Sequence, residues 1–193
     1  MTKTALDMET KGDWYKFYKR FNRRFKRVLD ESPQTLTEAC EILGFTYSAI
    51  EKRRNEIWDY SFRTKHLKKI GDYYGVSLDW LFDVKYLDHD YMQLPEDKEG
   101  ESAFDFEDED DWREYYSTVI NKVRTVFKNT QETPTSFAEF LGVETVTFYE
   151  WLKKDNVNIR WTARRLKKLA DYFGVSLDWL FDIKYTRVRY RNE

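Results

Sequence analysis

The chain contains one stretch of sequence twice, and this repeat constrains its fold more than any other feature. Residues 68–86 read KKIGDYYGVSLDWLFDVKY and residues 167–185 read KKLADYFGVSLDWLFDIKY, so that 15 of 19 positions are identical at an offset of 99. A weaker match continues upstream at an offset of 98, for example between Asp13-Trp14 and Asp111-Trp112. The 193 residues therefore predict two copies of one unit of about 75 residues, which is near the lower size limit for independent folding.

Each copy has the pattern of a small helical bundle. Apolar residues recur every three or four positions over 14–29 and again over 112–127, as on one face of a helix. A threonine (Thr35, Thr133) before the next apolar run and a glycine (Gly44, Gly142) after it are typical ends of a short second helix. The helices predicted to follow are, in pairs, 47–54 and 145–153, 64–74 and 162–173, and a short one after Ser77 and Ser176.

One strand per copy is predicted after the fifth helix. The segments VKYLDHDY (84–91) and IKYTRVRY (183–190) alternate and are rich in β-branched and aromatic residues. We expect the two strands to pair antiparallel between the copies, because that register brings opposite charges together. The charged residues concerned are Asp88, Asp90, Arg187 and Arg189.

Charge is distributed unevenly along the chain. Lys and Arg total 33 and Asp and Glu total 35, yet residues 88–111 hold 12 acidic residues and one basic residue. The copies on either side, 11–87 and 112–193, each carry a net charge of +5. We therefore expect two basic domains, 11–87 and 111–193, joined by a solvated acidic linker over 88–110.

Several protein classes are excluded by the residues. No apolar run approaches 18 residues and the first residues lack an apolar signal core, so we expect neither a membrane span nor a secretory leader, but a cytoplasmic protein. One cysteine, Cys40, and two histidines, His66 and His89, offer too few ligands for a metal or a catalytic triad, and His66 is expected near the surface. We expect no enzyme activity and no cofactor, because no nucleophile–base spacing is present.

In both copies a short helix, a glycine turn and a third helix come before the closing phrase GVSLDWL. In the second copy the pattern is Ala138, Leu141 and Gly142, followed by Phe148 and Trp151. This arrangement resembles the Cro and lambdoid-repressor (XRE) helix-turn-helix family, over about 150 residues in two pieces. The resemblance implies a mainly α chain of tandem five-helix helix-turn-helix domains. They would form an internal pseudo-dimer with a short antiparallel β pairing between the copies.

The family places its third helix in the major groove of double-stranded DNA. By position, the resemblance implies base contacts from Tyr47, Ser48, Glu51, Lys52, Thr145, Val146, Tyr149 and Glu150. It implies phosphate contacts from Arg53, Arg54, Arg63, Lys65, Lys153, Lys154, Arg160 and Arg164. Phosphate contacts set affinity and register but carry no sequence information.

The two third helices differ, and the second helix departs from the family pattern. Lys52 corresponds to Glu150, a reversal of charge that should favour different bases in two unlike half-sites. Where the family often has a DNA-contacting Gln, this chain has Leu36 and Pro134, neither of which can donate a side-chain hydrogen bond.

The function expected is a sequence-specific transcription regulator, a repressor that acts by occupying its site. Such compact regulators occur on phages and conjugative plasmids, and the double arrangement is similar to transfer-gene repressors of Gram-positive conjugative plasmids. We expect a monomer that binds duplex DNA without a membrane or a small-molecule ligand. The alternative is a protein-binding inhibitor on the same fold, such as a phage anti-defence protein. The first helix adds four cations that form either a solvated face or a phosphate clamp: Arg23, Arg24, Lys26 and Arg27.

Overall fold

The structure is a computed structural model that describes residues 8, 10–84, 103, 106, 108–155 and 158–184. The described residues form ten helices and one two-stranded sheet, which confirms a mainly helical chain. The first copy comprises α1 (Lys11–Asp30), α2 (Leu36–Leu43), α3 (Tyr47–Asn55), β1 (Ser61–Arg63), α4 (Thr64–Tyr74) and α5 (Leu78–Leu81). The second comprises α6 (Glu109–Lys128), α7 (Pro134–Leu141), α8 (Thr145–Lys153), β2 (Arg160–Thr162), α9 (Ala163–Phe173) and α10 (Leu177–Leu180).

Local sequence decides where the helices begin and end. The hydroxyls of Thr35 and Thr133 accept hydrogen bonds from the third residues of α2 and α7, as expected for N-caps. Both helices end at a glycine, Gly44 with a φ of 69° and Gly142 with a φ of 67°. This left-handed conformation is strained for residues with a Cβ, so glycine gives a tight turn into α3 and α8.

The core is aromatic in both copies. In the first copy, the ring of Phe21 stacks on that of Phe82, with ring centroids 4.9 Å apart, and both side chains are fully buried. In the second, Phe137 stacks on Phe148 at the same centroid distance. The apolar stripes expected on α1 and α6 face these clusters. Among the described residues, no helix is long and apolar enough to cross a bilayer.

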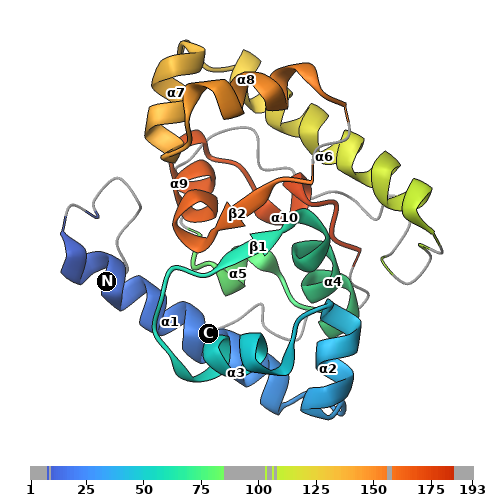
Figure 1. Ribbon diagram of the computed structural model, residues 1–193. Helices are drawn as coiled ribbons and strands as arrows, with labels where there is room; N and C mark the ends of the chain where they lie inside the picture. The colour runs from blue at the N-terminus through green and yellow to red at the C-terminus, as the bar shows by residue number, and fades with distance from the viewer. Residues whose placement is uncertain are drawn as a thin grey trace.

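The two copies meet at the strands. β1 and β2 pair antiparallel and lie between the helices of the first copy and those of the second (Figure 1). The register places Phe62 opposite Trp161 and Arg63 opposite Arg160. Phe62 and Trp161 are buried, whereas Arg63 and Arg160 are exposed. The ribbon thus packs one face on the core and turns its arginines outward.

The sheet between the copies is therefore formed by other residues than those predicted. It precedes α4 and α9, whereas the sequence predicted strands after α5 and α10. Val84, Ile183 and Lys184 are not in a strand, and the rest of 84–91 and 183–190 lies outside the described residues, together with Asp88, Asp90, Arg187 and Arg189. A three-residue strand is too short to produce a recognisable alternation, so the sequence did not predict β1 and β2.

The short helices α5 and α10 exchange hydrogen bonds between the copies. Asp178 on α10 accepts from Ser77 Oγ and from the first backbone N–H of α5, both at 2.6 Å. Asp79 on α5 accepts in return from Ser176 Oγ and from the first backbone N–H of α10, both at 2.6 Å. Both aspartates are buried. The bonds are therefore reciprocal, since each short helix accepts from the start of the other.

Each copy also has a buried lysine paired with an aspartate one turn further along the same helix. Lys68 Nζ lies 2.9 Å from Asp72 Oδ2, and Lys167 Nζ lies 2.8 Å from Asp171 Oδ2, with all four side chains inaccessible. An ammonium group without water must be paired and hydrogen-bonded, because the desolvation cost is otherwise several kcal/mol.

Each buried lysine also reaches the other copy. Lys68 Nζ donates to the carbonyl of Asp182 at 2.6 Å, and Lys167 Nζ donates to the carbonyl of Asp83. Asp83 and Asp182 follow α5 and α10 and have positive φ angles of 53° and 49°. Aspartate adopts this backbone conformation more readily than most residues. The lysines therefore secure the chain just after α5 and α10, where each copy meets its neighbour.

Candidate nucleic-acid interface

The third helix of the first copy presents polar side chains to solvent. Ile50 is fully buried and holds α3 against the rest of the copy, in contact with α1 and α2. Ser48 and Lys52 are exposed on the opposite side of α3, and Tyr47 is exposed at its first turn. Three of the four base-contacting residues predicted on α3 are therefore accessible to a partner.

The third helix of the second copy presents a more apolar surface. Phe148 and Trp151 are buried and anchor α8. Val146 is 71% exposed and Tyr149 is 42% exposed, while Thr145 is half-buried. A valine with this exposure can contact a thymine methyl group, but it can equally contact an apolar protein surface.

Two of the predicted base contacts already have ionic neighbours. Glu51 lies 3.5 Å from Arg54, whose Nε donates to Asp30 Oδ1 at 3.0 Å. Glu150 lies 3.6 Å from Lys154. Pairs as exposed as these are worth only about 0–1 kcal/mol, so a polyanion can displace them.

Arg63 and Arg160 form the central feature of this surface. They lie directly opposite each other across β1 and β2, at the line where the copies join. Both are exposed, and within the described part of the chain neither guanidinium has an ion pair with a carboxylate. Like charges directly opposite each other destabilise a strand pair. An anion bound here would relieve that repulsion.

Arg53 is half-buried and its guanidinium is bonded within the first copy, so we withdraw it from the predicted phosphate contacts. Its guanidinium donates to the carbonyl of Ala49 at 2.9 Å and to the carbonyl of Ser61 at 3.0 Å. It also stacks over the ring of Phe45, 4.4 Å from the centroid. Burial lowers the pKa of Arg53 from its ordinary value. The side chain therefore ties α3 to β1, and its loss would destabilise the fold.

The remaining predicted phosphate contacts are on the surface. Lys153, Lys154 and Arg164 are exposed and Lys65 is half-buried. The guanidinium of Arg164 lies over the ring of Trp14, 4.5 Å from its centroid, so this residue of the second copy packs on the first. These positions are compatible with the predicted role.

The four cations predicted on the first helix divide into two kinds. Arg24 donates to the carbonyl of Trp80 and lies 3.2 Å from Asp83, and Arg27 pairs with Glu31 at 2.7 Å. Arg23 and Lys26 are instead exposed.

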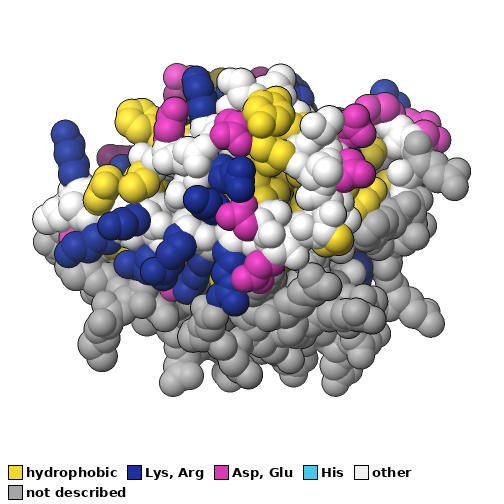
Figure 2. Space-filling model, turned by 90° about the horizontal axis from the view of Figure 1, so that it is seen from below, with side chains coloured by type: hydrophobic (Ala, Val, Ile, Leu, Met, Phe, Trp, Pro, Cys, Tyr) yellow, Lys and Arg dark blue, Asp and Glu magenta, His cyan; other side chains and the backbone are white. Residues whose placement is uncertain are grey.

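A basic stripe on α1 extends the predicted cations Arg23 and Lys26 by two residues that the sequence analysis did not name, Lys16 and Lys19. Its exposed members occur at spacings of three and four residues, which place them on one side of a helix. Figure 2 shows Lys and Arg side chains gathered on one side of the face seen from the α1 to α3 end. The 3–4 spacing of the cations could have revealed this stripe: Lys16, Lys19, Arg23 and Lys26.

His66 is buried against the ring of Phe45 and does not lie at the surface as expected. Its Nδ1 accepts a hydrogen bond from the backbone N–H of Arg63 at 3.2 Å and so closes the first turn of α4. Burial, aided by the charge of Arg53, lowers the pKa of His66 to about 3. The neutral ring therefore supports the strand that carries Arg63.

Stability is expected to depend on this histidine between pH 6.5 and 5. In that interval the unfolded chain gains a proton on His66 and the folded chain does not, so the free energy of unfolding falls as the pH falls. The loss should reach about 2 kcal/mol at pH 5. His66→Asn keeps an acceptor but does not titrate, so this part of the pH dependence should vanish in urea unfolding curves. His89→Asn is the control, and an equal effect from it would contradict the assignment.

The described residues form no metal-binding cluster, and the comparisons with known proteins found no relative. In the described ranges, no three or more His, Cys, Asp and Glu side chains lie together as metal ligands would. No protein family, curated protein or solved structure matches the chain.

Proposed function

We propose that this chain is a sequence-specific transcription regulator that binds double-stranded DNA. In this proposal the two copies are tandem helix-turn-helix domains that form an internal pseudo-dimer, with α3 and α8 as the recognition helices. The chain acts as a repressor by occupying its site. Because the exposed residues of α3 and α8 differ, it reads two unlike half-sites and binds in one orientation.

The observation that carries the proposal is the position of Arg63 and Arg160. The strands that bear them lie between α3 and α8 (Figure 1). A cationic centre flanked by two exposed helices suits a duplex, because its phosphates line both sides of each groove. The reciprocal bonds between α5 and α10 support a fixed relation between the two recognition helices, which a single site on DNA requires.

Binding to duplex DNA should depend on salt and on the central arginines. Each phosphate contact releases counterions, so the logarithm of the affinity falls linearly with the logarithm of salt concentration, by about 0.9 per contact. Arg63→Ala/Arg160→Ala should reduce this slope by about 2 and weaken binding to all sequences alike. Fluorescence anisotropy with the DNA upstream of the chain's own gene, from about 50 to 200 mM salt, measures both quantities.

The control removes the same charge elsewhere. Arg113 and Lys128 lie exposed on α6, and Arg113→Ala/Lys128→Ala should leave the slope nearly unchanged. If both double variants change the slope equally, general charge and not the central pair is responsible. A footprint with two identical half-sites, equally sensitive to mutation, would contradict the proposal that α3 and α8 bind unlike half-sites.

A second candidate function is favoured by α8 alone. Val146 and Tyr149 expose apolar surface there, and Glu144 and Glu150 add negative charge where phosphates would approach. This surface also suits a protein, so the alternative is an inhibitor that binds a protein partner. An affinity for duplex DNA that does not change with salt concentration, together with a footprint that covers one half-site only, would favour that alternative.

A further inference from the structure

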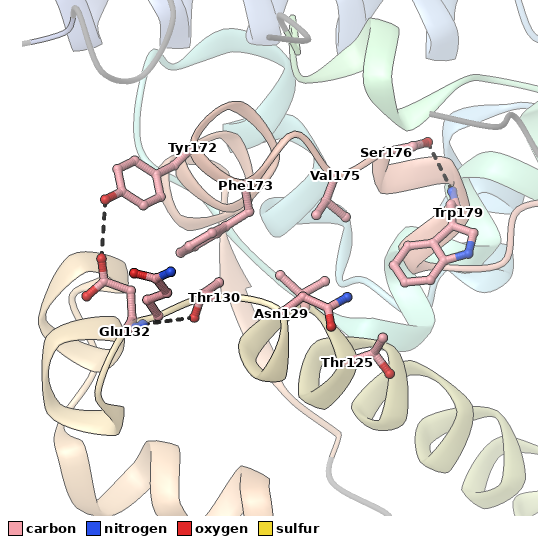
Figure 3. Close-up of a pocket in the computed structure, with 11 residues that line it drawn as sticks. Thr125, Asn129, Thr130, Glu132, Tyr172, Phe173, Val175, Ser176 and Trp179 are labelled. Carbon is pink, nitrogen blue, oxygen red and sulfur yellow. Dashed lines mark hydrogen bonds between the residues drawn. The ribbon is translucent and has the colours of Figure 1, made fainter. Parts of the chain in front are cut away.

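The second copy contains a cavity that the proposed function does not use. It has a volume of about 390 Å³ and lies between α6, the loop from α6 to α7, and the segment from α9 to α10 (Figure 3). The volume falls within the range of small-molecule sites in proteins. The site is independent of whether the chain binds DNA.

Five of the eleven residues that line the cavity are aromatic or aliphatic. Phe173 and Trp179 line it from the α9 to α10 side, and Val126 lines it from α6. Figure 3 shows Tyr172 and Glu132 at one end and Trp179 at the other. A flat apolar molecule could therefore lie along the cavity with its polar group at one end.

The polar group that fits is a cation. Of the eleven lining residues, Glu132 is the one that carries a charge. Its carboxylate accepts hydrogen bonds from Tyr172 Oη at 3.3 Å and from Ser136 Oγ, and neither of these donors is positively charged. A carboxylate beside apolar walls attracts an ammonium group more strongly than it would in water.

The first copy has longer side chains at the matching place. Thr125 and Asn129 line the cavity, and at an offset of 98 they correspond to Arg27 and Glu31. Arg27 Nε donates to Glu31 Oε1 at 2.7 Å, so two long paired side chains stand where the second copy has two short ones. The lining of the cavity therefore differs between the copies at these two positions.

We propose that this cavity binds a small aromatic compound that carries a protonated amine. The ring lies in the apolar part lined by Phe173, Val126 and Trp179, and the ammonium group pairs with Glu132. The sequence led us to expect no small-molecule ligand. We revise that expectation because the cavity is built from three segments that only the fold brings together.

Tryptamine is a suitable probe, and indole-3-acetate is its matched control, since it has the same ring and the opposite charge. Titration of the full chain, followed by ¹H–¹⁵N NMR, should give saturable shifts over residues 125–132 and 172–179 with tryptamine at or below millimolar concentration. Tryptamine should bind at least about tenfold more tightly than indole-3-acetate. Equal binding of the two probes, or shifts confined to other residues, would overturn the proposal.

Two variants separate the site from a general effect. Thr125→Arg/Asn129→Glu introduces the Arg–Glu pair that the first copy has at Arg27 and Glu31, and it should abolish the shifts. The amide spectrum of this variant reports whether the chain still folds. Glu132→Gln should keep the ring site and remove the preference for tryptamine. The matched control, Arg27→Thr/Glu31→Asn, should leave tryptamine binding to the second copy unchanged. Unaltered binding by the first double variant would also overturn the proposal.

Discussion

Asp178→Ala is expected to lower the free energy of unfolding by about 3–5 kcal/mol. The Asp178 side chain is buried and accepts two hydrogen bonds of 2.6 Å from the first copy, one from Ser77 Oγ and one from the backbone N–H of Leu78. Hydrogen bonds to a charged group contribute about 1.5–3 kcal/mol each, and alanine leaves both donors without this acceptor. Urea unfolding with an unchanged m value measures the loss.

The reciprocal residue provides an internal comparison. Asp79→Ala removes the equivalent bonds to Ser176 and α10 and should cost a similar amount. Asp155→Ala is the control, because this carboxylate is 82% exposed and its pairing with Arg124 should contribute less than about 1 kcal/mol. A loss of that small size for Asp178→Ala would mean that the copies are not held together through α5 and α10.

Lys167→Met is expected to destabilise the fold by about 3–5 kcal/mol. Methionine has a similar length but leaves the buried carboxylate of Asp171 without its cation, 2.8 Å away. It also removes the hydrogen bond to the carbonyl of Asp83 in the first copy. Burial lowers the pKa of Lys167, because little water reaches its ammonium group. Thermal or urea unfolding detects the change.

A double variant tests whether the loss of the cation beside Asp171 is the cause. Lys167→Met/Asp171→Leu replaces both ions with apolar groups of similar volume and should recover much of the loss. Arg113→Met, which breaks the exposed pair with Asp110, should cost less than about 1 kcal/mol. If the double variant is no more stable than Lys167→Met, the lysine stabilises the fold by packing and by its bond to Asp83.

The sequence alone determined the local structure of the chain. The repeat predicted two helical copies, and caps such as Thr35 and Gly44 lie where the pattern placed them. These features depend on a few neighbouring residues, since a cap satisfies backbone groups within one turn and an apolar stripe follows the helical period. The exposure of Ser48 and Lys52 follows from the same period, because Ile50 occupies the buried side of α3.

Only the tertiary structure decided how the copies meet and which polar residues serve the interior. The sheet at β1 and β2, the internal hydrogen bonds of Arg53 and the burial of His66 all depend on groups brought from other elements. In the sequence, Asp79 and Asp178 look like ordinary polar residues of the repeated segment. Their hydrogen-bond partners lie about 100 residues away in the chain, so only the fold shows them. The physical reason is that burial and pairing depend on how distant segments pack together, whereas periodicity and capping depend on a single segment.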